Sequence, residues 1–444
     1  MNFQESVRYL LSLGRELAAP TQAAAAKFNL ENIITLARSL GHPERKYPSV
    51  HIAGTNGKGS TAAFLESIFR HAGYRTGLYT SPHLERINER IRVNSEEIPD
   101  QAFADVFTGI HHVIEELLAA GALRAHPTFF ECVTAIAFAY FAEAGAQIAI
   151  FETGLGGRLD ATNIIVPEAC IITRIDFDHE NFLGHSLPEI AAEKAGIIKP
   201  GVPVIVAEQR DEARPVILAK AHDLSAPIIE TNSAFCIESA RMMNGFVRAE
   251  IQEIATHKHF EVAPHLAGRF QLQNALNAVT TARLLQSKAF RVSDDDIEKG
   301  ISAAIWPGRI EKVHTSPDIY LDGAHNPSAA RELAIFLEEN LTGRKLILVF
   351  GALRDKAVDE IAGILFPLAA EVIFTQPNTS RAISVAQLAS IAGHHASQYK
   401  IIPDSAQALD AALADATPLD VICITGSLYL VGELRGRSQT ATRN

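Results

Sequence analysis

The sequence predicts an α/β protein in which a mostly parallel sheet is followed by a second, smaller α/β unit. Short apolar runs alternate with helical stretches along most of the chain, which is typical of parallel strands buried on both faces. A glycine-spaced loop with one lysine, residues 54–61, stands between the first of these runs and a helical stretch. This order of strand, loop and helix is typical of a phosphate-binding site, because a helix N-terminus presents free N–H groups to an anion.

Composition and charge narrow the class of protein. The chain has 444 residues, 47% of them hydrophobic and 20% charged, as in a globular protein of two or three domains. Its net charge of −11 gives no overall attraction to nucleic acid or to an anionic membrane. Glu5 and Arg8 argue against an export signal, and no apolar run reaches the roughly 18 residues of a membrane span. We expect a cytoplasmic monomer whose partners are small anionic molecules.

Cysteine usage indicates a reduced protein. The four cysteines lie far apart and form no C-x-x-C pair. We expect all of them to be reduced core residues, namely Cys132, Cys170, Cys236 and Cys423.

Two helices are expected within residues 1–47, joined by the alanine-rich stretch 18–26, and they lead into the first strand at residues 50–53. After the phosphate loop and its helix, residues 77–80 form a short strand that runs into a loop containing Ser81. Further strands and helices follow in alternation: strands at 148–151, 170–173 and 202–206, and helices within 101–144 and from Ser186, the latter containing Lys194.

Polar groups follow the ends of these strands. Gly54, Ser81, Glu152 and His179 each come directly after a predicted strand or in the loop that it enters. Because ligands of open parallel sheets bind at the carboxyl ends of the strands, we expect these groups to lie on one rim.

A second unit begins after Pro307 and Gly308, which mark a boundary. Before it, residues 228–263 are expected to form a meander of short strands, and residues 268–303 two helices. The second unit is smaller and Rossmann-like, with strands at 319–321, 346–350, 372–374 and 421–424. We expect domains at 1–304 and 305–435, a disordered tail at 436–444, and an active site in the cleft between the two domains.

The phosphate loop is a variant of the Walker pattern. Ile52 occupies the first glycine position of G-x-x-x-x-G-K-[ST], and Gly59 occupies the hydroxyl position. Taken alone, such a loop can be only a tight turn, Ser81 a turn serine before proline, and Glu152 a solvated strand end. Four candidates on one predicted rim favour a ligand site over these separate structural explanations.

A series of motifs in a fixed order extends this argument from about residue 7 to Arg435: Gly54–Ser60, Thr80–Leu84, Glu152–Asn163, Asp178–His179, Glu193–Lys199, Pro307–Arg309 and Asp322–Pro327. Together they resemble folylpolyglutamate synthase/dihydrofolate synthase, a family of the Mur ligase superfamily. The resemblance implies an ATP-dependent amide ligase. In such an enzyme the acceptor carboxylate attacks the γ-phosphate of ATP, and the amine of L-glutamate then takes the acyl group of the resulting acyl phosphate.

The resemblance also implies a set of nucleotide and metal contacts. ATP would be held by Gly54, Thr55, Asn56, Gly57, Lys58, Gly59, Ser60, Thr61, Asn274, Arg309 and Asp322. Mg²⁺ would be held by Ser81, Glu152, His179 and a carbamylated Lys194, and K⁺ is a further candidate cofactor. The catalytic roles would fall to Lys58, His179, Lys194 and Arg309.

The same resemblance suggests where the other substrates bind. Phe129, Arg158 and Asp160 would contact the folate or pterin, and His325 and Ser427 the incoming glutamate. Asp160 occurs in the version of the motif found in bifunctional members, which use dihydropteroate as well as tetrahydrofolates. We therefore expect both activities.

Alternative functions remain open. The chain could extend polyglutamate tails only, or join amino acids to a cell-wall nucleotide as other members of the superfamily do, although only about 47 residues precede the phosphate loop. A non-catalytic ATP-binding module would have lost its metal ligands, and a simple kinase would turn over ATP without an amino acid.

Overall fold

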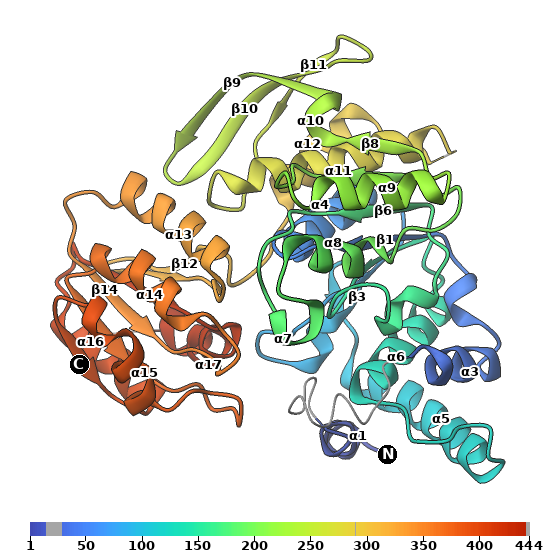
Figure 1. Ribbon diagram of the computed structural model, residues 1–444, viewed down its shortest axis with the longest axis horizontal. Helices are drawn as coiled ribbons and strands as arrows, with labels where there is room; N and C mark the ends of the chain where they lie inside the picture. The colour runs from blue at the N-terminus through green and yellow to red at the C-terminus, as the bar shows by residue number, and fades with distance from the viewer. Residues whose placement is uncertain (15–28, 289, 441–444) are drawn as a thin grey trace.

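The computed structural model describes residues 1–14, 29–288 and 290–440, and Figure 1 shows two α/β units side by side. The first sheet has the strand order β4-β3-β2-β5-β1-β6-β7-β8. All neighbours from β2 to β8 pair in parallel, and β3 and β4 add an antiparallel edge. The strands are β1 (Ser49–Ala53), β2 (Thr76–Tyr79), β3 (Ile91–Val93), β4 (Glu96–Glu97), β5 (Ile148–Glu152), β6 (Ala169–Ile172), β7 (Val204–Val206) and β8 (Ile228–Glu230).

Helices cover both faces of this sheet. One face packs against α4 (Lys58–His71), α11 (Phe270–Gln286) and α12 (Asp294–Ala303). The other face packs against α1 (Phe3–Ser12), α3 (Glu31–Ser39), α5 (Asp100–Ala119), α6 (Phe129–Glu143), α8 (Leu187–Ala195) and α9 (Arg214–Asp223). Because successive strand residues point to opposite faces, Val50 and Ile52 of β1 join the first core, whereas Ala53 joins the second. The short helices α7 (Glu180–Leu183) and α10 (Thr231–Ala234) complete this unit.

Most of the predicted meander forms a separate antiparallel sheet, β9 (Phe235–Met243), β10 (Phe246–Glu253) and β11 (His259–Val262), whereas its first residues, 228–230, belong to the first sheet as β8. The inward residues of the antiparallel sheet belong to the same core as α4 and α11, so it extends the first unit.

The second sheet has the order β12-β13-β17-β14-β15-β16, all parallel except for β12. Its strands are β12 (Glu311–His314), β13 (Asp318–Leu321), β14 (Leu346–Phe350), β15 (Glu371–Phe374), β16 (Tyr399–Ile401) and β17 (Val421–Thr425). One face packs against α13 (Pro327–Asn340), α14 (Val358–Leu365) and α15 (Val385–Ala392), and the other against α16 (Ser405–Asp415) and α17 (Leu428–Gln439). At the edge strand β16, Tyr399 and Ile401 are exposed, and Lys400 between them pairs with Glu371 and Asp415.

The fold class is confirmed, and three details of the expectation are wrong. The tail does not begin at residue 436, because α17 continues to Gln439; residues 441–444 lie outside the described residues. Cys236 is exposed on β9, while the other cysteines are buried. The edge strands β3, β4, β12 and β16 were not expected, because each is short and carries polar residues. The alanine-rich stretch 18–26 lies outside the described residues, and the domain boundary at residue 304 stays a prediction.

Candidate active site

The phosphate loop joins the end of β1 to the first residue of α4. Gly57 precedes that helix with φ 88°, a left-handed conformation that favours glycine, and no side chain caps the helix. A Cβ atom on Gly57 would lie 2.3 Å from Oδ1 of Asn274, and one on Gly54 would lie 1.8 Å from Oγ1 of Thr173. Asn274 and Thr173 therefore pack against the loop, and the two glycines are sterically required. Asn274, predicted to bind ATP, does lie against the loop.

Lys58 folds back over its own loop. Its Nζ donates to the carbonyl oxygens of Gly54 at 3.1 Å and Thr55 at 3.2 Å, and it lies 4.0 Å from Oε1 of Glu152. Ser60 and Thr61 are buried at the start of α4. The loop thus carries one lysine charge next to the buried carboxylate that ends β5, as the strand-end argument predicted.

The oxygen atoms of Glu152 and Ser81 accept few hydrogen bonds from the described residues. The backbone N–H of Ser81 donates to Oε2 of Glu152 at 3.3 Å, while the Ser81 hydroxyl is buried and has no hydrogen-bond partner among the described residues. Burial raises the pKa of Glu152, and the Lys58 charge opposes that rise. A carboxylate and a hydroxyl with free lone pairs are the oxygen donors that Mg²⁺ prefers, so these two residues fit the predicted metal.

Lys194 and His179 approach the rim from α8 and from the loop after β6. Lys194 donates to the same Gly54 carbonyl as Lys58, at 2.7 Å, and burial together with the Lys58 charge lowers its pKa to about 7. Burial also lowers the pKa of His179 to about 3, so its imidazole is neutral, as metal coordination requires. Its Nδ1 is buried without a hydrogen-bond partner. The ion-pair contacts of His179 run to Asp178 and Asp355, and the structure does not bring it into contact with Glu152.

Asp178 joins the two units. Its carboxylate lies 2.6 Å from Nζ of Lys356, 3.3 Å from Nε2 of His325, and 3.4 Å from Nδ2 of Asn326. Burial alone would raise the pKa of Asp178, but Lys356 and His325 hold it well below its usual range. Asn326 also exchanges two side-chain hydrogen bonds with Asn56 of the phosphate loop, at 3.0 and 3.3 Å. The strand-end loops of the second unit therefore face the rim of the first, as expected.

Sequence reasoning did not assign Lys356 or Asp355 to the site. They lie in the loop after β14, where the Asp355 carboxylate accepts a hydrogen bond from the Arg381 guanidinium. Their position after a buried strand was the available signal, because the same rule had selected Ser81 and Glu152.

Asp322 and Arg309 lie together at the start of the second unit. Both Asp322 oxygens accept backbone N–H groups, from Ile310 and from Ala324, each at 2.9 Å, so this carboxylate fixes the local loop. The Arg309 guanidinium donates to the Gly308 carbonyl and interacts electrostatically with Asp322 and Glu152. Arg309 is thus a cation between the two units, while the ATP contact predicted for Asp322 stays a prediction.

Two of the residues predicted to bind folate, Asp160 and Arg158, lie in different environments. Asp160 is buried and accepts N–H bonds from Gly154 and Leu155 at 2.8 and 3.0 Å, and N–H and O–H bonds from Thr162 at 3.0 and 2.5 Å. It therefore anchors the glycine-rich loop, residues 154–160. Arg158 is more than half exposed and pairs with Glu193 at 2.8 Å.

The aromatic residue predicted to stack on the pterin is buried, and its pterin contact stays a prediction. Phe129 is only 3% exposed, and the Arg90 guanidinium lies 5.5 Å from its ring centroid, so its faces are covered by protein. The ring of Phe130 instead lies against Gly154, 2.5 Å from where a Cβ on that glycine would be. Phe130 is the aromatic residue at the glycine-rich loop.

Of the two residues predicted to bind glutamate, His325 contacts Asp178 of the first unit. His325 donates from Nδ1 to the Gly323 carbonyl at 2.7 Å and directs Nε2 toward Asp178. Ser427 is buried, and its hydroxyl accepts the backbone N–H of Tyr429 at 3.1 Å as the cap of α17. Ser427 therefore has a structural role as a helix cap, and its contact with glutamate stays a prediction.

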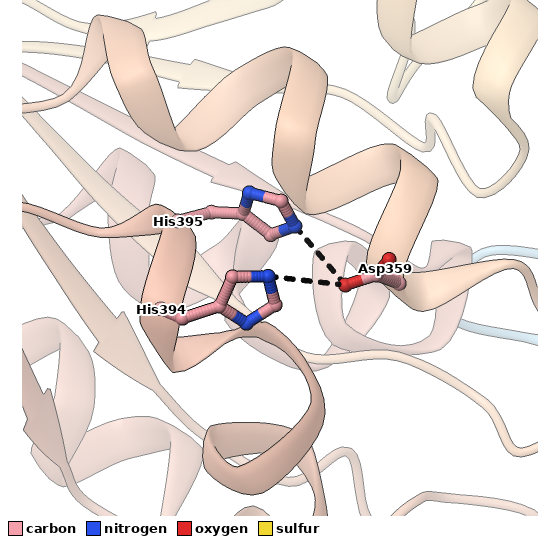
Figure 2. A group of neighbouring side chains, drawn as sticks. All are labelled: Asp359, His394 and His395. Carbon is pink, nitrogen blue, oxygen red and sulfur yellow. Dashed lines mark hydrogen bonds and ion pairs between the residues drawn. The ribbon is translucent and has the colours of Figure 1, made fainter.

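A second group of metal-ligating side chains lies on the second unit (Figure 2). Asp359 of α14 accepts from His395 at 3.0 Å and lies 3.7 Å from His394, both in the turn after α15. Two imidazoles and one carboxylate suit zinc rather than magnesium. Asp359 and His394 are well exposed, and exposed pairs of this kind also form without a metal. This group does not belong to the predicted magnesium site.

Comparisons with known proteins agree with this arrangement. Residues 52–282 match the Mur ligase middle domain, and residues 308–428 match the Mur ligase glutamate ligase domain. The dihydrofolate synthase/folylpolyglutamate synthase of Bacillus subtilis is 36% identical over 90% of this chain and 93% of the relative. The protein of the same description from Escherichia coli is 34% identical over 91% of this chain and 90% of the relative.

Solved structures give the same result. The Mycobacterium tuberculosis folylpolyglutamate synthase complexed with ADP superposes with a TM-score of 0.88 at 30% identity, covering 98% of each chain. The Escherichia coli FolC structure in complex with DHPP and ADP superposes with a TM-score of 0.85 at 30% identity, covering 99% and 98% of the two chains.

A phosphate loop with an acidic strand-end rim, faced by a second α/β unit, defines an ATP-dependent ligase of the Mur type. The matches extend over nearly the whole chain, including residues outside the two domain models. The chain belongs to the folylpolyglutamate synthase/dihydrofolate synthase family.

Proposed function

We propose that this enzyme uses ATP to join L-glutamate to 7,8-dihydropteroate and to the γ-carboxylate of tetrahydrofolates. The observation that carries the proposal is the rim itself. Lys58 and the Ser81 N–H lie next to Glu152 in the first unit. His325 and Lys356 of the second unit contact Asp178 of the first unit. Such a site can hold a nucleotide phosphate from one unit and an amino acid from the other.

The names of the relatives support both activities. Relatives at 32% identity include a folylpolyglutamate synthase from Lacticaseibacillus casei and a dihydrofolate synthetase from Saccharomyces cerevisiae. Several relatives carry both names, and the Escherichia coli structure holds DHPP with ADP. Extension of polyglutamate tails alone is the second candidate, favoured by the Lacticaseibacillus relative.

The reaction places negative groups against one another, so cations must offset them. A carboxylate oxygen of the acceptor attacks the γ-phosphorus and ADP leaves; the glutamate amine then attacks the acyl carbon and inorganic phosphate leaves. Lys58 is positioned to turn from its own loop carbonyls to the transferred phosphate, and Arg309 adds charge from the second unit. Lys356 and His325 are positioned for the glutamate carboxylates, which would compete with Asp178 for them.

Magnesium would be held by Ser81, Glu152 and His179. The buried Oγ of Ser81 and the buried Nδ1 of His179 lack hydrogen-bond partners among the described residues. When bound, magnesium would neutralise charge on the phosphates. Lys194 is buried beside Gly54, and carbamylation would convert its cation into an anion facing the Lys58 charge. A monomeric state and a use of K⁺ remain part of the proposal.

Phosphate release from Mg-ATP with L-glutamate tests the proposal, with 7,8-dihydropteroate and a tetrahydrofolate compared as acceptors and products identified by mass. Activity with both acceptors supports the two-activity proposal. Activity with tetrahydrofolate alone favours the tail-extending alternative, and release without any amino acid would indicate a kinase.

A further inference from the structure

A buried histidine in β1 has no role in the site as described so far. His51 is fully buried, and its neighbours in register on the adjacent strands are Phe151 and Cys170. A hydrocarbon side chain would pack at such a position without the penalty that a buried polar ring incurs when its nitrogens are unpaired. The imidazole is therefore present for a hydrogen bond.

That hydrogen bond leads to the anchor of the glycine-rich loop, residues 154–160. Nε2 of His51 lies 2.7 Å from the Thr162 hydroxyl, which donates to Oδ1 of Asp160 at 2.5 Å. The other oxygen of Asp160 accepts the backbone N–H groups of Gly154 and Leu155. The chain of contacts runs from the strand that carries the phosphate loop to the backbone of the glycine-rich loop.

The direction of these bonds is determined by the donors available. A hydroxyl has one proton, and the Thr162 proton points to the carboxylate, which only accepts when it is ionised. His51 must then donate from Nε2, which leaves Nδ1 as an acceptor, and among the described residues the buried Nδ1 has no hydrogen-bond partner. The contact orients the Thr162 hydroxyl, so that its proton is fixed toward Asp160.

We propose that His51 is a positioning residue for the folate-type acceptor, acting through Thr162 and Asp160 on the glycine-rich loop. The proposal rests on the proposed function, because it takes that loop and Phe130 as one wall of the acceptor site. His51 itself touches neither substrate. Since dihydropteroate has no glutamate tail to add binding contacts, its use depends more on this wall than the use of tetrahydrofolates does.

Two substitutions that differ by one methylene separate positioning from simple packing. The amide of glutamine reaches the position of Nε2, whereas the amide of asparagine reaches only that of Nδ1. We expect His51→Asn to raise KM for dihydropteroate about five- to tenfold, the effect of one lost hydrogen bond. KM for tetrahydrofolate should rise less and KM for Mg-ATP should not change, while His51→Gln should restore most of the loss.

Thr162→Val removes the hydroxyl at nearly constant volume, and the double variant with His51→Asn should be no worse than Thr162→Val alone. Thr281→Val is the matched control, because within the part of the chain that the structure describes the buried Thr281 hydroxyl bonds only to the carbonyl of Asn277 in its own helix. Three results would each overturn the proposal. They are an equal rise in KM for dihydropteroate in His51→Gln and His51→Asn, additive effects of His51→Asn and Thr162→Val on that KM, and a parallel rise in KM for Mg-ATP.

Hydrogen–deuterium exchange gives a readout that does not depend on the reaction. The amides of residues 154–162 should exchange faster in His51→Asn than in the wild type, and at the wild-type rate in His51→Gln. Unchanged exchange in His51→Asn overturns the positioning role. If the wild type makes no dihydrofolate, the two-activity proposal fails, and the exchange result still decides the role of His51.

Discussion

At the scale of single residues, the site is defined by charges that burial makes sensitive to their neighbours. Lys58, Lys194 and Glu152 lie within a small region where water is largely excluded. Each charge there interacts more strongly than it would on the surface, because the local dielectric response is weaker. Substitutions that change one charge should therefore affect the others.

Lys58→Met tests the phosphate role. We expect kcat for ATP-dependent ligation to fall about 100-fold or more, because a positioned cation is lost from the transferred phosphate. Lys258→Met is the control, since Lys258 is an exposed lysine that pairs with Asp294. Steady-state kinetics of both variants decides the matter, and full activity in Lys58→Met would contradict the assignment.

Lys194 predicts a pH dependence of stability. The pKa of Lys194 is about 7 in the folded enzyme and near 10.4 when unfolded, so between these values the unfolded chain binds one more proton. The unfolding free energy should rise with pH in this window, by about 1 kcal/mol from pH 7 to 8, and should gain nothing from this group below pH 7. Urea denaturation in CO₂-free buffer measures it.

Lys194→Met is the comparison variant. Its unfolding free energy should lack the rise between pH 7 and 8 that the Lys194 amine contributes. An identical slope in both proteins would mean that the amine is charged when folded, which would also remove support for carbamylation.

At the scale of elements, two glycines with nearly the same backbone φ flank helix α4. Gly57 precedes the helix with φ 88°, and Gly73 follows it with φ 85°. Only at Gly57 would a Cβ meet a neighbour, Asn274, since nothing lies within 4 Å at Gly73. The difference between the two sites is therefore steric.

Alanine at either glycine should lower the unfolding free energy by roughly 1 kcal/mol through backbone strain. Gly57→Ala alone should also displace the phosphate loop and raise KM for ATP at least tenfold, as a shift of about 1 Å in a binding group commonly does. Thermal unfolding and ATP kinetics measure the two effects. Equal KM values in the two variants would show that the loop tolerates the extra atom.

Element by element, the sequence predicted most of what positions the site. The long apolar strands and the loops after them were visible because burial on both faces leaves continuous apolar runs. The contact of Phe130 with the glycine-rich loop could not be predicted, because α6 is apolar nearly all round and its sequence does not show which face meets that loop. Lys356 was missed although it follows a buried strand, because no local pattern indicates that this loop will contact the other unit.

At the scale of the whole molecule, the ion pair between Asp178 and Lys356 is one of the contacts between the two units. Their side chains are 10% and 4% exposed, so removal of one partner leaves a poorly solvated charge. Lys356→Met should lower the unfolding free energy by about 3 kcal/mol and raise KM for glutamate. Lys299→Met, which breaks an exposed pair with Asp295, should change stability by less than about 0.5 kcal/mol.

Asp178→Asn in the Lys356→Met background should recover part of the lost stability, because the unpaired charge is gone. Denaturant titration of the single and double variants completes the cycle. Strictly additive losses would mean that the two units are held by other contacts.

No helix in the described ranges has both the length and the apolar character needed to cross a bilayer. The predictions of a cytoplasmic location and of a domain boundary at residue 304 stay predictions.

The open edge of the second sheet has a consequence for self-association. Strand β16 pairs on one side only, with β15, and exposes Tyr399 and Ile401 on the strand itself. An unpaired apolar edge is a template for another strand, and a lysine is a common means of blocking such pairing. Lys400 occupies that place on β16, so its charged side chain opposes pairing of this edge with a strand of another molecule.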